Sequence, residues 1–235
     1  MTRWFYSLPV RLITCALMLS ALLAASVAAS APQAGADPAV NRPFVDPEFE
    51  QWVARFERPG REVYDKRHEI IAATGVRPGM VVADIGAGTG LFARLFSAAV
   101  GPSGKVIAVD VSRVFIDNIL RIAREQGQRN VEGIVNTQTD SLLAAGSIDL
   151  AFLSDTYHHF EHPQAMMKSI HRALRPGGTL VVIDFQKHGH SSDWIKGHVR
   201  AGSQTVIEEI GVAGFELVRE ETFLRENYFL RFTRK

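Results

Sequence analysis

The chain has 235 residues, of which 46% are hydrophobic and 22% are charged. This composition supplies enough apolar material for one globular domain with a short appendage. The formal net charge is +1, and the Lys and Arg residues are scattered rather than grouped, which argues against a nucleic-acid partner.

The first thirty residues have the layout of a secretory signal. Arg3 and Arg11 precede an apolar run, and small residues follow as far as Ser30. Residues 1–30 are therefore predicted to be a signal peptide that is cut after Ala29 or after Ser30. The rest of the chain is predicted to be secreted or periplasmic.

An uncleaved anchor is the alternative interpretation of this segment. Residues 12–29 form an apolar run without charges, and about 20 residues are needed to cross a bilayer. The chain would then contact a membrane only through its N-terminal segment. Cys15, the one cysteine, lies in the same segment, so a cleaved chain would have neither disulfide nor thiol chemistry.

Residues 31–45 are rich in Ala, Pro, Gly and Asp and show little periodicity, which predicts a flexible linker. The globular domain is predicted to occupy residues 46–235. An amphipathic helix is expected over 46–58, because its apolar residues recur at helical spacing, at Phe49, Trp52, Val53 and Phe56. A second helix is expected over 62–74.

Apolar strands then alternate with helical stretches. Strands are predicted near 80–85, 105–110, 131–136, 148–154 and 179–185, and helices near 90–100, 112–127 and 163–174. Such alternation is typical of a doubly wound α/β fold, in which helices cover both faces of a mostly parallel sheet.

The C-terminal part breaks the alternation. The sequence Thr205-Val206-Ile207-Glu208 has the pattern of a capping box and predicts one more helix. Residues 215–223 and 228–233 are predicted to be two strands joined by a short loop. The expected fold is a seven-stranded, Rossmann-like sheet that ends in an antiparallel hairpin.

A buried strand that runs into a glycine-rich turn is the most informative feature. Asp84 is followed by the spacing Gly86-x-Gly88-x-Gly90. A helix is predicted to begin after this turn, so the N-terminus of that helix would face any ligand that the turn binds. Dinucleotide sites have the spacing G-x-G-x-x-G, which this loop lacks. The next strand also ends in an acid, Asp110, whose two oxygens can accept hydrogen bonds from a cis-diol.

Loop, helix, strand and terminal acid, in this order, resemble the class I S-adenosylmethionine-dependent methyltransferases, in particular those that act on small molecules. The resemblance covers about residues 60–235 and includes the Pro-Gly-Gly turn at 176–178 and the C-terminal hairpin. It implies S-adenosylmethionine as cofactor and a small-molecule methyl acceptor. By this resemblance, Asp84 helps to orient the methionine part of the cofactor and Asp110 accepts from both ribose hydroxyls.

The resemblance also implies roles for residues outside the loop. Asp140 would accept from the adenine amine and Ser141 or a neighbour would meet the ring nitrogen, with a solvated acidic turn as the alternative. Arg61 would neutralise the methionine carboxylate, with an ordinary exposed arginine as the alternative. The predicted cofactor-binding residues are Asp84, Gly86, Ala87, Gly88, Gly90, Asp110, Val111, Asp140, Ser141, Ser154 and Arg61.

The polar and aromatic segment 153–160 follows the fourth strand, where ligands of open α/β sheets bind. Methyl transfer is an in-line displacement, so the protein mainly aligns the reactants and excludes water. His158 or His159 is the expected base for an acceptor that keeps its proton, and only one of the two is expected to face the substrate. Tyr157 could form a wall of the pocket. The alternative is that these histidines only stabilise the loop and that Tyr157 packs beneath it.

Seven histidines lie between residues 158 and 198, but there is no cysteine near them and no recognised zinc spacing, so no metal site is predicted. The predicted function is methyl transfer from S-adenosylmethionine to a small acceptor in the cell envelope, with the N-terminal helices and residues 187–202 shaping the acceptor pocket. The alternative is a non-catalytic protein of the same fold that binds S-adenosylmethionine, S-adenosylhomocysteine or another nucleoside. No oligomeric state is predicted.

Overall fold

The computed structural model describes residues 1, 2, 4, 35–189 and 191–235. The chain divides into two units, residues 1–33 and 34–235, and the second contains the fold. The predicted signal peptide or anchor lies outside the described residues, apart from three positions near its start. Among the helices that the structure describes, none is long and apolar enough to cross a membrane.

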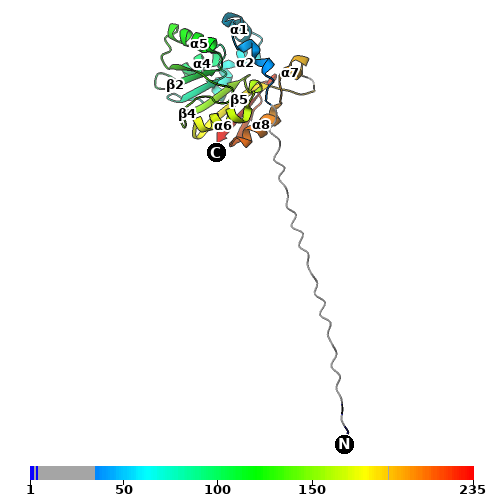
Figure 1. The fold of residues 1–235 in the computed structure, drawn as a ribbon. Coiled ribbons are helices and arrows are strands. Elements are labelled where there is room, and N and C mark those ends of the chain that lie inside the picture. The colour runs from blue at the N-terminus through cyan, green and yellow to red at the C-terminus, as the bar shows by residue number, and fades with distance from the viewer. Residues whose placement is uncertain (3, 5–34, 190) are drawn as a thin grey trace. The chain divides into compact units, whose positions relative to one another are not determined.

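A single seven-stranded sheet forms the centre of the second unit, with the strand order β3-β2-β1-β4-β5-β7-β6 (Figure 1). All neighbouring pairs are parallel except those of β7, which runs antiparallel to both β5 and β6. This confirms the predicted mostly parallel sheet with a C-terminal antiparallel hairpin. The strands are β1 (Val81–Ile85), β2 (Lys105–Asp110), β3 (Val131–Val135), β4 (Ile148–Ser154), β5 (Leu174–Phe185), β6 (Phe215–Glu221) and β7 (Asn227–Arg234).

Helices cover both faces of the sheet, as the alternating pattern predicted (Figure 1). The α-helices are α1 (Phe49–Phe56), α2 (Glu62–Asp65), α3 (Arg67–Ala73), α4 (Leu91–Val100), α5 (Arg113–Glu125), α6 (Pro163–Ala173), α7 (Asp193–His198) and α8 (Ser203–Val212). Two 3-10 helices, η1 (Pro38–Phe44) and η2 (Tyr157–His159), complete the described elements.

The core consists of two clusters, one on each face of the sheet. Successive strand residues point to opposite faces, so Val82 packs with α3, α4 and α5, whereas Ala83 packs with α6 and α8. Burial on both faces explains why the central strands are continuous apolar runs. Because the central strands are buried on both faces, polar groups that bind a ligand must come from the strand ends.

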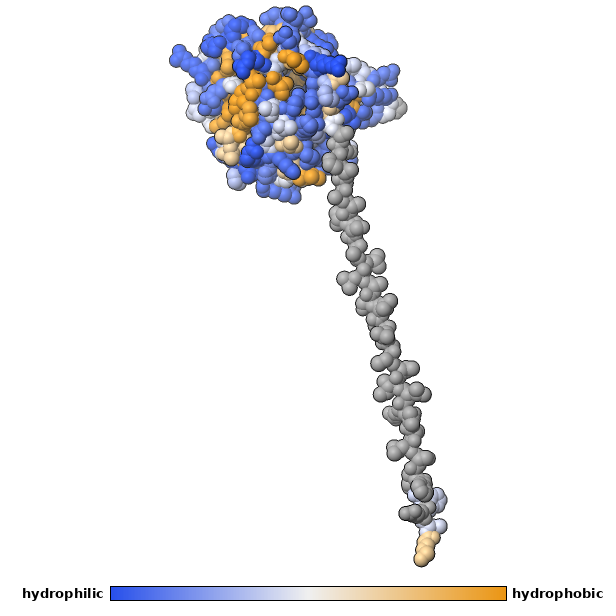
Figure 2. Space-filling view, in the orientation of Figure 1, coloured by the Kyte–Doolittle hydropathy of each residue, from blue (hydrophilic) through white to orange (hydrophobic). Residues whose placement is uncertain are grey.

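The surface is mostly hydrophilic and carries a band of hydrophobic residues on the viewed face (Figure 2).

The flexible linker predicted over 31–45 is wrong for residues 35–45. Pro38 begins η1, and Asp37 caps that helix by accepting from the backbone N–H of Ala39 at 2.8 Å. The backbone N–H of Ala36 donates to the carbonyl oxygen of Phe160 at 2.9 Å. Proline fixes φ and so lowers the entropy that folding must overcome, which lets this short segment pack against the loop after β4.

Three element boundaries also differ from the prediction. The second predicted helix breaks at Lys66 into α2 and α3. The fifth strand begins at Leu174 instead of following the Pro-Gly-Gly turn, because the turn forms an irregularity inside β5, with Gly177 at φ 72°. The capping box is wrong, since α8 already begins at Ser203 and Thr205 lies in its first turn.

Candidate active site

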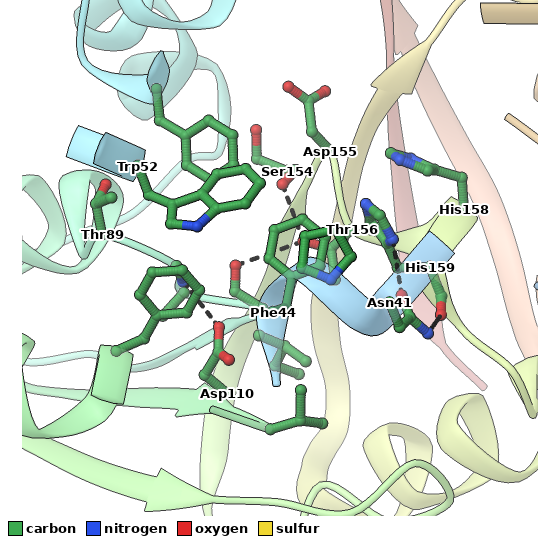
Figure 3. A pocket seen from close by; sticks show the side chains of 18 of the residues that line it. Asn41, Phe44, Trp52, Thr89, Asp110, Ser154, Asp155, Thr156, His158 and His159 are labelled. Atoms are coloured by element: carbon green, nitrogen blue, oxygen red, sulfur yellow. Dashed lines mark hydrogen bonds between the residues drawn. The ribbon is translucent and has the colours of Figure 1, made fainter. Parts of the chain in front are cut away.

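A cavity of about 590 Å³ opens at the carboxyl ends of β1, β2 and β4. It is lined by the glycine loop between β1 and α4, by the loop after β4, and by side chains of η1, α1 and α7 (Figure 3). This edge of the sheet is where ligands bind in open α/β folds. The predicted cofactor loop and the predicted catalytic segment therefore face one common space.

The glycine loop requires glycine for two different reasons. Gly86, Gly88 and Gly90 have φ values of 72°, 53° and 79°, which side-chain-bearing residues rarely adopt. A Cβ at Gly86 would also lie 2.3 Å from Cγ2 of Thr156, and one at Gly90 would lie 2.7 Å from Cγ1 of Ile119. Gly86 and Gly88 line the cavity, whereas Gly90 serves the packing of α4 against α5.

Two buried carboxylates stand at the ends of β1 and β2. Burial, together with the nearby charge of Asp110, raises the pKa of Asp84 to about 7. Burial also raises the pKa of Asp110 to about 6, although its oxygens accept from the backbone N–H groups of Gly88 and Ser112, each at 2.9 Å. Oδ2 of Asp84 has no hydrogen-bond partner among the described residues, so it can accept from a ligand.

Asp140 and Ser141, the residues predicted to meet the adenine, make other contacts in the structure. The carboxylate of Asp140 pairs with Arg172 at 3.0 Å and accepts from the backbone N–H of Leu142, contacts that hold its pKa below the usual value. Ser141 is fully buried against Ser169. Neither residue lines the cavity. Asn136 and Gln138, which the sequence interpretation missed, line that end instead.

The loop after β4 is held by ionic contacts. Asp155 has φ 49°, a strained value for a residue with a side chain. Its carboxylate accepts from Arg61 at 2.5 Å and from the side-chain amide of Asn227 at 2.6 Å. Arg61 lines the cavity but is already paired, and its guanidinium also donates to the carbonyl oxygen of Phe56. The contact predicted between Arg61 and the methionine carboxylate of the cofactor therefore stays a prediction. It requires the guanidinium of Arg61 to bind that carboxylate and Asp155 at the same time.

His158 is buried, with its side chain 3% exposed, and is oriented by Asp184. Nδ1 lies 2.7 Å from one oxygen of Asp184, and the backbone N–H of His158 donates to the other oxygen at 3.0 Å. Burial opposes the charged imidazole, but the carboxylate outweighs it, so the pKa of His158 is raised. His158 lines the cavity, and its Nε2 has no partner within the described part of the chain.

His159 also lines the cavity, contrary to the expectation that only one histidine faces it. The two rings lie 4.1 Å apart, because residues 157–159 form the turn η2 and not an extended stretch. Burial and the neighbouring histidines lower the pKa of His159 to about 3. Tyr157 is not a pocket wall. Its hydroxyl donates to Glu209 at 2.7 Å beneath the loop, which matches the alternative interpretation for this residue.

Aromatic side chains form the remaining wall of the cavity. Phe44 of η1 packs on Trp52 of α1 with ring centroids 4.6 Å apart (Figure 3). Trp52 in turn packs on Phe56, with ring centroids 5.0 Å apart. Trp194 of α7 and Phe185, 5.4 Å apart, also line it. The N-terminal segment and the region 187–202 therefore contribute to the cavity, as predicted.

The sequence around this cavity is similar to that of known proteins. The family described as methyltransferase domain matches residues 82–178, which contain the glycine loop, both buried acids and η2. This part of the chain is therefore similar to a methyltransferase domain. Domains of this class depend on S-adenosylmethionine, and the seven-stranded Rossmann-like sheet is their fold.

Two relatives carry the printed name ubiquinone/menaquinone biosynthesis C-methyltransferase UbiE. The protein of Ectopseudomonas mendocina is 32% identical over 125 residues, 51% of this chain and 47% of the relative. That of Pasteurella multocida is 35% identical over 122 residues, 50% of this chain and 44% of the relative. This chain thus aligns with about half the length of the curated relatives that it matches.

Solved structures share the fold at lower identity. A methyltransferase of Aquifex aeolicus that depends on S-adenosylmethionine superposes with a TM-score of 0.70 at 23% identity, over 77% of this chain and 96% of the other. The cyclase SpnF superposes with a TM-score of 0.64 at 19% identity, over 76% of this chain and 84% of the other. At these identities the likeness concerns the fold, and the site residues must indicate the reaction.

The residues of the cavity fit S-adenosylmethionine. Asp110 presents the two oxygens that a ribose diol requires, and Asp84 and Ser154 present buried oxygens without partners among the described residues. The positive-φ loop leaves Gly88 open to the cavity, and Val111 follows Asp110 at its rim. The cofactor would lie between this loop and the end of β2, with Asn136 and Gln138 near the base.

Proposed function

We propose that this protein transfers the methyl group of S-adenosylmethionine to a small acceptor bound beside His158. The observation that carries the proposal is that one cavity is lined by the glycine loop, Asp110 and His158, whose Nε2 has no partner among the described residues. A protein that only held a nucleoside would need no oriented imidazole facing that space. The fold places the cofactor residues on β1 and β2 and the imidazole on the loop after β4.

The acceptor is proposed to be a small, largely apolar ring compound that carries a hydroxyl group. Phe44, Trp52, Phe185 and Trp194 supply flat apolar surfaces around the cavity, and aromatic rings favour offset or edge-on contact with other rings. The names of the two relatives also indicate an acceptor of quinone biosynthesis and a carbon nucleophile. Transfer to a ring carbon next to the hydroxyl is therefore the favoured outcome.

His158 is proposed to accept the proton that the acceptor loses. Bound S-adenosylmethionine supplies a methyl group on a sulfonium, which is a good leaving group. Asp184 keeps Nδ1 of His158 protonated, and Nε2 then presents its lone pair to the cavity. The acceptor gains a methyl group and loses one proton to Nε2, so charge and atoms balance. The aromatic wall excludes water from the reacting groups.

An envelope location remains part of the proposal, supported by the signal-like sequence of residues 1–30. It requires a supply of S-adenosylmethionine outside the cytosol. Fractionation of cells that express the full chain with a C-terminal epitope tag tests the location. Recovery in the periplasmic or membrane fraction supports export, and recovery only in the cytosol contradicts it.

Calorimetric titration with S-adenosylmethionine and S-adenosylhomocysteine tests cofactor binding, beside an Asp110→Asn variant. We expect binding at one site, weakened at least tenfold in the variant. Transfer of a labelled methyl group to a panel of phenols and quinols tests catalysis. Binding without transfer to any panel member would favour the non-catalytic alternative over the proposed class of acceptor. No binding to either compound would contradict the proposal as a whole.

A further inference from the structure

Three imidazoles meet at the side of the cavity away from the glycine loop. His158 and His159 lie next to each other on η2, and His198 joins them from the end of α7. The ring of His198 lies 5.0 Å from that of His158 and 5.2 Å from that of His159. One nitrogen from each ring lies within 4.8 Å of the others. Figure 3 shows the first two side by side.

The imidazoles of His158, which is buried, and of His159, which is half-buried, are oriented through their Nδ1 atoms. Nδ1 of His158 contacts Asp184 at 2.7 Å, and Nδ1 of His159 contacts Oδ1 of Asn41 at 2.9 Å. The amide of Asn41 has a fixed orientation, because its nitrogen donates to the carbonyl oxygen of His159 and to the carboxylate of Glu161. Both Nδ1 partners are therefore oxygens that accept, which leaves Nε2 of each ring as the atom with a free lone pair.

This pattern is the one that histidine ligands of metals show. A ligating imidazole donates its other N–H to a carboxylate or a carbonyl oxygen, which fixes both tautomer and ring orientation. Nε2 of His158 supplies an independent indication, since it is a buried atom of a residue that lines the cavity and has no partner among the residues that the structure describes. A structural role for His158 alone would not require that His159 be held in the same way.

His198 supplies the adjustable third ligand. It is only partly buried, and its ring stacks on Trp194 with centroids 4.5 Å apart, at the end of a helix of 6 residues. Ligand nitrogens of a tetrahedral zinc site lie about 3.4 Å apart, as follows from Zn–N distances of about 2.0–2.1 Å. Metal binding would therefore move His198 toward the two fixed imidazoles.

We propose that His158, His159 and His198 form a binding site for a divalent transition metal, with Zn²⁺ as the ion that three neutral imidazoles fit well. Three protein ligands are typical of catalytic zinc sites, in which the fourth position stays open to substrate. Here the fourth position faces the cavity. The buried carboxylates of Asp155 and Asp184 lie nearby and favour a cation.

The role of the metal rests on the proposed function, whereas metal binding itself does not. With a metal bound, Nε2 of His158 would be a ligand and could not accept the proton, so the metal would bind the acceptor hydroxyl in its ionised form and the proton would pass to solvent. The metal then replaces His158 as the group that activates the acceptor. Removal of the metal would abolish methyl transfer in that case, whereas it would leave transfer intact if the imidazole alone is the base.

The test measures Zn²⁺ binding by the full chain, purified without a histidine tag. Elemental analysis after gel filtration should find one equivalent of Zn²⁺, and competition with a chromogenic chelator gives the affinity. We expect His198→Ala to weaken binding at least tenfold. Asn41→Ala should weaken it by about 10–100-fold, because it frees the ring of His159. His68→Ala, which removes an exposed histidine of α3, is the matched control and should bind as the parent does.

Far-UV circular dichroism of each variant establishes that it is folded. Failure of the parent to retain stoichiometric Zn²⁺ would overturn the site. Equal affinity in His198→Ala and the parent would overturn it as well. The Asp110→Asn variant separates this inference from the proposed function, since it should lose S-adenosylmethionine and keep Zn²⁺.

Discussion

Asp184 near the end of β5 contacts both the ring and the backbone of His158, with Nδ1 at 2.7 Å and the backbone N–H at 3.0 Å. The two contacts fix the loop and the ring together, so the direction of Nε2 is set by β5 and not by η2 itself. Both residues are nearly inaccessible to solvent, at 3% and 1% exposure. The pair therefore belongs to the rigid centre of the fold while it serves the cavity.

Substitution Asp184→Asn should lower methyl transfer without loss of the cofactor. The asparagine amide can donate to Nδ1, which would place the proton on Nε2 and remove the lone pair that faces the acceptor. We expect kcat to fall by about 100-fold or more, because loss of the carboxylate that orients an imidazole and fixes its tautomer has effects of this size. The Kd for S-adenosylmethionine, measured by calorimetry, should stay within twofold.

Asp193→Asn is the matched control for that variant, because Asp193 is a fully exposed acid on α7 close to the cavity. Its kcat should equal that of the parent. An Asp184→Asn protein with normal kcat would show that the orientation of His158 does not matter for transfer.

Affinity for S-adenosylmethionine should fall as the pH falls through about 6. The pKa of Asp110 is about 6 in the protein without ligand. The ribose hydroxyls donate to the ionised carboxylate, so binding favours the ionised form and lowers the pKa of Asp110 from this raised value. Calorimetry between pH 5 and 8 should show a Kd that is constant above pH 7 and rises toward tenfold per unit at the acid end. Asp110→Asn should bind weakly with no such slope, and a flat profile in the parent would contradict this role of Asp110.

Substitution Asp84→Asn should stabilise the cofactor-free protein at pH 8. The pKa of Asp84 is raised from 3.8 to about 7, so the folded state binds more protons than the unfolded state between these values, and stability falls as the pH rises through this window. At pH 8 the buried charge costs on the order of 2–4 kcal/mol, which asparagine avoids. Urea unfolding at pH 8 and pH 4 measures the difference, with no gain expected at pH 4. Equal or lower stability at pH 8 would contradict the argument.

The sequence allowed prediction of the parts of the site that depend on local order along the chain. Asp84 and Asp110 stand at or near the ends of largely apolar strands, and the glycine turn follows the first of them, so their position at the sheet edge could be deduced. Asp184 stands near the end of a predicted strand and could have been found by the same rule.

The residues that were missed depend on contacts between distant segments. Asn41 reaches His159 across 118 positions, and no local pattern indicates such a pairing. The histidine cluster was dismissed because the known zinc spacings are local, whereas folding joins positions 158 and 198 through α7. Asp140 pairs with Arg172 and does not line the cavity, and the composition of its turn does not distinguish a turn that accepts a ligand from one that binds its own arginine.

Deletion of residues 35–45 tests whether that segment is part of the domain. A protein that begins at residue 35 keeps η1, with its contact between Phe44 and Trp52 and the hydrogen bonds of Asn41. One that begins at residue 46 loses both. We expect the shorter protein to unfold at a lower temperature and to bind the acceptor more weakly, since the aromatic wall is opened. Thermal scans that coincide for the two proteins would restore the interpretation of a flexible linker.

Substitution Gly86→Ala should abolish cofactor binding, and Gly101→Ala shows how much of the effect is backbone strain alone. Both glycines have positive φ, 72° and 66°. A Cβ at Gly101 meets no described atom within 4 Å, so this variant should lose only about 1–3 kcal/mol of stability from the strained backbone, φ 66° and ψ −173°. A Cβ at Gly86 lies 2.3 Å from Thr156, and the loop after β4 must move to admit it. That movement displaces Asp155, which has a strained φ of its own and is the ionic partner of Arg61.

We therefore expect Gly86→Ala to lose more stability than Gly101→Ala in urea unfolding, and S-adenosylmethionine affinity to fall only in Gly86→Ala. Equal losses in the two variants would mean that the loop after β4 yields freely and that the close contact between the two loops does not position the site.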